Sequence, residues 1–396
     1  MDLIGWVIFI AALLISVMLH ETGHFIFAKA FGMKVTRYFV GFGPTIWSTW
    51  RGDTEYGIKA LPLGGFVKIV GMHSLDDPDD PADEFGAFRS KPAWQRIIVL
   101  CAGSAMHFLL ALLLFFGLAV GFGVPSNTTQ LGTISPCVPA NITAYDNGTC
   151  TPSDPVSPAE QAGLQVGDVV TAVNGKPVSN WTQLTDAVRA APAWEPVTIT
   201  VRRHGHLLTL DTTLAAVSGR SGSYMGIGGT LTSSPLPAIE NAGTTFGQVL
   251  VGSAQAAADL PAALPRLFNA KERANSPGGQ VTSLVGAAQA TGAAVGSSES
   301  WQYKLSFVLL LIASLNIFVG AFNMLPLLPL DGGHIAVIIY ERIRAWLARL
   351  RGRPDPGLAD MAKFVPVMLG LFMVIVCLAL VLVAADIVNP LNFSGG

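Results

Sequence analysis

Two histidines and a glutamate interrupt the first long apolar run of the chain. His20, Glu21 and His24 lie in the stretch LHETGH, inside a hydrophobic segment that begins near Leu3. Because His20 and His24 are four residues apart, a helix places both imidazoles on one face, where they can bind one zinc ion. Glu21 is positioned to act as general base towards a water molecule at that metal. Chance occurrence of the motif is disfavoured, since ionisable groups inside a membrane span are costly.

Two histidines leave a catalytic zinc site one protein ligand short. The best candidate for the third ligand is Asp331, in the stretch NMLPLLPLDGGH (residues 323–334). Pro326 and Pro329 are expected to break the helix just before it, and irregular backbone is tolerated in a membrane where it lines a cavity. His334 is the rival third ligand, and helix capping is the alternative role of Asp331.

The composition indicates a membrane protein. The chain is 51% hydrophobic and 13% charged, whereas soluble domains carry about 25% charged residues. A net charge of −2 gives no indication of a nucleic-acid partner. Four apolar segments are long enough to cross about 30 Å of hydrocarbon. They cover 3–31, 97–122, 305–330 and 364–387.

The distribution of lysine and arginine predicts the orientation in the membrane. Basic residues are dense in 29–96 and 340–363 and absent from 1–28 and 364–396. The positive-inside rule therefore predicts a multi-pass protein of the cell membrane with both termini outside the cytoplasm. The long loop 123–304 also lies outside, and the candidate metal site lies near the cytoplasmic side.

The long outside loop contains a pattern of short strands and helices. A short helix ends at Gly163, a strand ends at Asn174-Gly175, and an alternating hairpin turns near His204-Gly205. This pattern resembles a PDZ domain, with a peptide groove expected along residues 131–134. The domain could bind a peptide terminus, exclude bulky substrates as a filter, or be a structural cap.

Two cysteines lie in a polar insertion within this loop. Cys137 and Cys150 are expected to form a disulfide if the loop is extracytoplasmic, and are otherwise two free thiols.

Several motifs together resemble one family. HETGH and NMLPLLPLDG look like the paired signatures of the site-2 protease family of intramembrane zinc metalloproteases. The PDZ-containing bacterial subgroup, which includes regulator of sigma-E protease, is the most similar. The resemblance implies that His20, His24 and Asp331 hold Zn²⁺ and that Glu21 is the catalytic base. Asn323 would orient the substrate backbone or support the transition state.

The resemblance extends to a cytoplasmic β-hairpin, with one departure from the family pattern in the second span. VGFGPTIW (residues 40–47) and IKALPLGGFVKIVGM (residues 58–72) resemble this hairpin, whose turn is expected at Gly64-Gly65. The hairpin could pair with an unfolding substrate strand or only cover the cytoplasmic mouth. In the second span, His107 replaces an expected asparagine, and it is either a hydrogen-bond donor to the oxyanion or a packed core histidine.

The resemblance implies a zinc-dependent intramembrane endopeptidase that performs regulated intramembrane proteolysis. Its substrates would be single-span membrane proteins, such as anti-sigma factors, already trimmed outside by a site-1-type protease. The alternatives are a catalytically silent PDZ-bearing scaffold and a metal transporter. Intact His20, Glu21, His24 and Asp331 disfavour the scaffold, and the lack of internal repeats disfavours the transporter.

The expected fold class is an α-helical polytopic membrane protein with four transmembrane helices, a membrane-associated β-hairpin and one extracytoplasmic PDZ (α+β) domain. The expected divisions are 1–31, first transmembrane helix with HExxH; 32–96, cytoplasmic loop with the hairpin; 97–122, second transmembrane helix; 123–220, PDZ domain; 221–304, extracytoplasmic amphipathic linker; 305–335, third transmembrane helix with the aspartate motif; 336–363, cytoplasmic loop; 364–388, fourth transmembrane helix; 389–396, tail.

Overall fold

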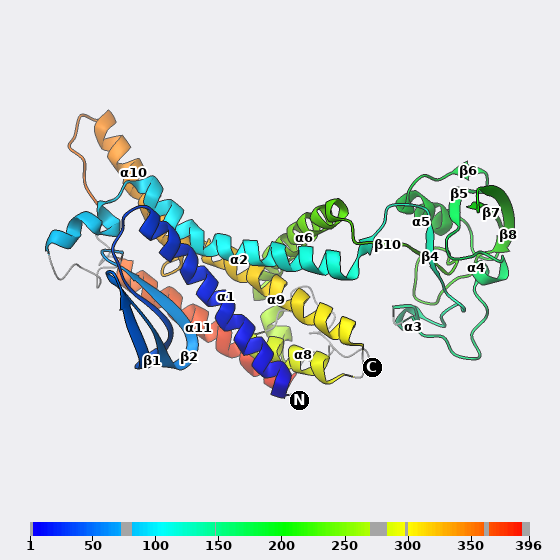
Figure 1. Cartoon of the computed structure of the whole chain (residues 1–396), viewed down its shortest axis with the longest axis horizontal. Coiled ribbons are helices and arrows are strands. Elements are labelled where there is room, and N and C mark those ends of the chain that lie inside the picture. Colours follow the sequence, from blue (N-terminus) through cyan, green and yellow to red (C-terminus); the bar gives the residue numbers. More distant parts are fainter. Residues whose placement is uncertain are drawn as a thin grey trace. The chain divides into compact units, whose positions relative to one another are not determined.

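The structure is a computed structural model that describes residues 3–72, 81–146, 148–269, 283–297, 300–359 and 364–389 (Figure 1). The expected tail beyond Asn389, and parts of both expected cytoplasmic loops, lie outside these ranges. The chain forms two compact units. Unit 1 comprises the chain up to Gly117 and again from Ala242, and unit 2 is Leu118–Asn241.

Unit 1 is built mainly from long apolar helices. Its elements are α1 (Leu3–Ala30), β1 (Val35–Arg51), β2 (Thr54–Ile69), η1 (Pro81–Gly86), η2 (Phe88–Ser90), α2 (Ala93–Phe122), α6 (Pro235–Ala263), η3 (Leu264–Arg266), α8 (Leu284–Gly296), α9 (Trp301–Asn323), α10 (Asp331–Leu350) and α11 (Val365–Val388). By length and composition, α1, α2, α9 and α11 can each cross a membrane. The four apolar helices expected from the sequence are therefore present.

One face of α1 carries the buried residues of the helix. Ser16, His20 and His24 recur every four residues on this face. Near the N-terminus of α1, a Cβ added to Gly5 would lie 2.6 Å from the Cα of Gly292 in α8. Only small residues permit such a close approach of two helices.

The region 221–304, expected as an amphipathic linker, is largely helical in its described part. It contains α6, and also α8, a buried helix that packs against α1, α9 and α11. The backbone N–H and the hydroxyl of Ser283, the N-cap of α8, donate to Oδ2 of Asp386 in α11 at 2.7 and 2.5 Å. A composition rich in alanine and glycine resembles a linker, but small residues are also what close helix packing in a membrane requires.

The third apolar helix ends before the aspartate motif. α9 ends at Asn323, residues 324–330 form turns, and α10 begins at Asp331. Proline lacks a backbone N–H and clashes with the preceding helical turn, so Pro326 and Pro329 prevent a continuous helix over 305–335.

The segment 336–363, expected as a cytoplasmic loop, contains most of α10, which continues to Leu350. Its apolar residues follow helical spacing. Arginines interleaved between them obscure this pattern in the sequence. The apolar residues are Ile339, Ile343, Trp346 and Leu350.

β1 and β2 fold into a sheet of four strand segments beside α1 (Figure 1). Residues 37–40 pair with 55–58 on one side and with 65–68 on the other, while 45–51 pair with 54–59. The outer segment, 65–69, follows α1 closely. β1 and β2 join at Gly52-Asp53, and the chain reverses again between 58 and 65, next to the expected turn at Gly64-Gly65. Gly64 has a positive φ, and Gly65 provides space, since its Cβ would lie 2.3 Å from Sδ of Met18.

Unit 2 is a small α+β domain. Its elements are β3 (Val124–Pro125), β4 (Leu131–Ile134), α3 (Ile142–Asp146), α4 (Pro158–Gln161), β5 (Val169–Val173), β6 (Lys176–Pro177), α5 (Trp181–Ala190), β7 (Pro196–Arg203), β8 (His206–Thr213), β9 (Ile227–Gly229) and β10 (Leu231–Thr232). Apolar residues from β4, β5, β7 and α5 form one core. The turn between β7 and β8 is at His204-Gly205, where both residues have positive φ. Cys137 and Cys150 form a disulfide.

The strand expected to border a peptide groove is paired on both sides only at its first residue. β4 pairs with β9, and the Leu131 N–H donates to the carbonyl of Asp168 at 2.8 Å. Among the described residues, Thr133 and Ile134 pair with β9 alone. The ring of Trp181, at the start of α5, lies against Gly229 of β9.

An ion pair ties the end of β7 to the turn before β5 in unit 2. Nε and one terminal nitrogen of Arg203 donate to the two carboxylate oxygens of Asp168 at 2.8 and 2.7 Å. These bonds hold the pKa of Asp168 below its usual value. The pair therefore stabilises unit 2 above about pH 4, and this contribution is lost as the pH falls through the lowered pKa.

Candidate metal centre

Three side chains from two distant parts of the chain converge inside unit 1. The Nε2 atoms of His20 and His24 are 3.0 Å apart, and Oδ2 of Asp331 lies 3.3 and 3.4 Å from them. α1 presents the two imidazoles one turn apart, and the helix break before α10 places the aspartate opposite them. Among the described residues, this is the group of histidine, cysteine and acidic side chains that could hold a metal ion.

The spacing of the three atoms fits zinc. A tetrahedral site with bonds of about 2.0–2.1 Å places its ligand atoms about 3.3 Å apart. The observed separations are 3.0–3.4 Å. Oδ2 of Asp331 is buried, with no hydrogen-bond partner in the described ranges. A buried carboxylate oxygen facing two imidazole nitrogens is well suited to coordinate a cation.

A backbone carbonyl fixes the orientation of His24. Its Nδ1 lies 2.7 Å from the carbonyl oxygen of Val99 in α2. Because a carbonyl only accepts, Nδ1 must carry the proton, and the lone pair of Nε2 is left for a metal.

Glu21 faces the β-sheet. Its Oε2 accepts a hydrogen bond of 2.9 Å from the backbone N–H of Val67, in the outer segment of β2. This bond holds the carboxylate beside the two histidines while leaving Oε1 able to take a proton.

Gly103 allows α2 to lie directly against the candidate ligands. A Cβ at this position would lie 2.5 Å from Nε2 of His24 and 2.7 Å from Nε2 of His20. Any side chain here would therefore occupy the space of the ligand atoms.

A buried polar cluster formed by His107, Asn316 and Ser16 lies beside His20. Nδ1 of His107 is 2.8 Å from Oδ1 of Asn316, and the hydroxyl of Ser16 donates to the same oxygen at 2.5 Å. The Asn316 side-chain amide donates to the carbonyl of Ile312, so its oxygen must face His107. The rings of His107 and His20 are 5.0 Å apart between centroids. Nδ1 of His107 is thus hydrogen-bonded inside the core, with its ring beside that of His20.

The remaining two candidates lie outside the ligand group. Asn323 is the last residue of α9, and His334 is buried in the first turn of α10. Neither is among the three side chains whose ligand atoms converge.

Several residues of the site carry no recognisable signal in the sequence. The contributions of Val99 and Val67 come from backbone groups, which every residue has. Asn316 and Ser16 are polar residues in apolar helices, and this polarity is the only feature by which the sequence could single them out.

Comparison with known proteins identifies the family. The profile of peptidase family M50 matches residues 8–353. The chain therefore belongs to this family, the site-2 proteases, and is a zinc metalloprotease with Zn²⁺ as its cofactor. The expectations of family, enzyme class and cofactor are confirmed.

Individual relatives agree with this result. Zinc metalloprotease Rip1 of Mycolicibacterium smegmatis is 36% identical over 98% of both chains, and Rip1 of Mycobacterium tuberculosis is 37% identical over the same shares. Zinc metalloprotease RasP of Shouchella clausii is 27% identical over 85% of this chain and 90% of that one. Among solved structures, the PDZ domain of the SdrC-like protein of Listeria monocytogenes covers 28% of this chain and 94% of its own, at 17% identity and a TM-score of 0.18, which is too low to support an argument.

Proposed function

We propose that this zinc metalloprotease cleaves single-span membrane proteins within or near their membrane segment. The observation that carries the proposal is the position of the site. Two of its three candidate ligands belong to α1, a helix long and apolar enough to cross a membrane. The substrates would be proteins such as anti-sigma factors, shortened beforehand by another protease outside the cytoplasm.

In this proposal His20, His24 and Asp331 hold the zinc ion. The bound ion supplies Lewis-acid chemistry, lowering the pKa of water and polarising the scissile carbonyl. Glu21 acts as general base: Oε1 takes a proton from the attacking water and passes it to the leaving amine. The Val67 N–H keeps the other oxygen of Glu21 in place during both transfers. Asn323 is assigned to orienting the substrate backbone at the end of α9.

The proposed orientation has both termini and unit 2 outside the cytoplasm, with the site near the cytoplasmic side. The Cys137–Cys150 disulfide supports an oxidising compartment for unit 2. Unit 2 is proposed to be a PDZ domain that excludes substrates with large outside portions. Its short helices, the β7–β8 hairpin and the two-stranded β4–β9 sheet support that assignment.

The experiment is cleavage of a pre-shortened single-span substrate by purified full-length protein, compared with Glu21→Gln. Glutamine keeps an oxygen for the Val67 N–H but is not a base. We expect a loss of about 10²–10⁴-fold in the cleavage rate, with zinc content unchanged. Equal rates would remove Glu21 from the mechanism. If neither protein cleaves while both hold zinc, the scaffold alternative is favoured.

A further inference from the structure

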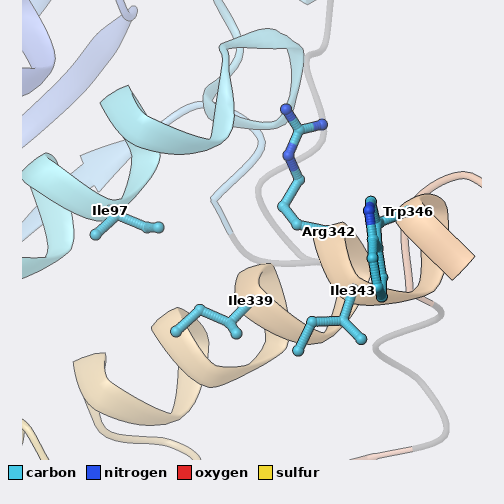
Figure 2. Close-up of a pocket in the computed structure, with 5 residues that line it drawn as sticks. All are labelled: Ile97, Ile339, Arg342, Ile343 and Trp346. Atoms are coloured by element: carbon cyan, nitrogen blue, oxygen red, sulfur yellow. The ribbon is translucent and has the colours of Figure 1, made fainter.

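A pocket that includes none of the candidate metal ligands lies where α10 packs on the start of α2. It has a volume of about 350 Å³ and is lined by Ile97 of α2 and by Ile339, Arg342, Ile343 and Trp346 of α10. Figure 2 shows the three isoleucines on the two facing helices and the guanidinium of Arg342 extending away from them. The pocket is apolar at its base and positively charged at one side.

The residues around the pocket are typical of a membrane boundary. α2 is one of the four apolar helices, and its apolar run begins at Ile97. Trp94, one turn earlier, is 56% exposed, and Trp346 of α10 is 57% exposed. Tryptophan is enriched where hydrocarbon meets lipid headgroups. An exposed tryptophan on each of the two helices is what such a boundary favours.

The exposed surface of α10 is that of a helix lying in this boundary. Ile339, Ile343 and Leu350 are 48%, 51% and 65% exposed and follow helical spacing. Exposed basic residues accompany this apolar stripe. They are Arg342, Arg349, Arg351 and Arg353. An apolar face flanked by arginines is characteristic of interfacial helices attracted to anionic lipids.

An internal ion pair fixes the two walls of the pocket. Arg96 of α2 donates to Glu341 of α10 at 3.2 Å, and both side chains are buried. Arg344 donates to the carbonyls of Pro356, Gly357 and Leu358, so it is also engaged. Arg342 differs from both, since no acidic side chain of the described ranges pairs with it and it is exposed. Its charge is available to a ligand.

We propose that this pocket binds an anionic phospholipid. One acyl chain lies against Ile97, Ile339 and Ile343, and the phosphate pairs with the guanidinium of Arg342. Trp346 packs against the glycerol region with its ring. The apolar base excludes a free phosphate ion as the natural ligand, and the cationic side favours an anionic headgroup over a zwitterionic one.

The test uses full-length protein in phosphatidylcholine nanodiscs that contain a minor fraction of lipid with brominated acyl chains. Bromine quenches tryptophan at short range, and the signal of Trp346 is obtained by subtracting the Trp346→Phe variant. We expect brominated phosphatidylglycerol to quench Trp346 at a mole fraction about five-fold lower than brominated phosphatidylcholine. Arg342→Gln should abolish this preference.

The matched control is Arg353→Gln, which removes an exposed arginine from the same end of unit 1 but not from the pocket. It should leave the preference for phosphatidylglycerol largely intact. Equal quenching by the two lipids in the wild-type protein would overturn the proposal. An equal effect of Arg342→Gln and Arg353→Gln would also overturn it, because the preference would then reflect general surface charge. Zinc content and thermal midpoint establish that each variant is folded.

Discussion

The smallest feature of the site is the missing side chain at Gly103. The hydrogen on its Cα faces the ligand nitrogens of both histidines, and a Cβ there would lie 2.5–2.7 Å from ring atoms of His24 and His20. The helix itself has no need of glycine at this position, because alanine is the better helix former. The residue is therefore explained by the space that the metal site requires.

Gly103→Ala should fold but lose zinc. The added methyl group would displace the imidazoles, and we expect affinity for zinc to fall at least about ten-fold, as for other disturbed metal sites. Competition with a chromophoric chelator measures the affinity. Gly117→Ala is the control, because its Cβ meets nothing within 4 Å on the same helix. Unchanged affinity in Gly103→Ala would show that the histidines can move aside without cost.

Residue chemistry explains how much of the site the sequence could predict. His20, Glu21, His24 and Asp331 have distinctive side chains at informative spacings, so they could be found. The Val67 N–H could not, because it became part of the site only when the outer segment of β2 was placed along α1. His107 could be singled out but not interpreted, since its partner Asn316 lies 209 residues away.

At the level of elements, a buried ion pair joins α10 to α2 beside their apolar contacts. Arg96 and Glu341 are each 9% exposed at their side chains, and the other oxygen of Glu341 accepts from the N–H of Ala359. A buried ion pair is weak evidence of net stabilisation, but breaking it leaves one charge buried alone.

Arg96→Met should lower the free energy of unfolding by about 3–5 kcal/mol. Combining it with Glu341→Gln removes the orphan charge while keeping an acceptor for Ala359, and should recover most of the loss. Denaturation of the detergent-solubilised protein, followed by fluorescence, measures both values. Arg349→Met, at an exposed position, should change stability by no more than about 0.5 kcal/mol. If the double variant is as unstable as Arg96→Met alone, the unpaired charge of Glu341 is not the cause of the lost stability.

The elements also show where sequence patterns mislead. Long apolar runs predicted α1, α2, α9 and α11, because helical spans need little besides length and hydrophobicity. Two adjacent glycines predicted a turn at 64–65, and the chain does reverse beside them, but it also reverses at Gly52-Asp53, where β1 joins β2. A glycine signals either conformational freedom or close packing, and the sequence alone does not distinguish these uses.

At the level of the whole molecule, the two units have separate cores and connect at a short ladder. β3 and β10 pair with Pro125 opposite Leu231, so the chain enters and leaves unit 2 at adjacent points. Such a connection allows one unit to be replaced without disturbing the other.

Replacing residues 126–230 with a short glycine–serine linker should allow cleavage of substrates that retain their outside domain. The rate for pre-shortened substrates should change little, because the ligands and Glu21 belong to unit 1. Cleavage in membranes of both substrate forms is the measurement. An unrelated folded domain of similar size, inserted at the same point, should restore resistance if bulk is what excludes the long substrate. Continued resistance after the replacement would rule out the filter.

The wide separation of the metal ligands in the chain has a consequence for synthesis. His24 and Asp331 are about 300 residues apart, and a ribosome adding about 5–20 residues per second needs roughly 15–60 s to pass from one to the other. During that interval the nascent chain contains the histidine pair of α1 but not Asp331. With the three-ligand site proposed above, the peptidase cannot become active until most of its own chain has been made.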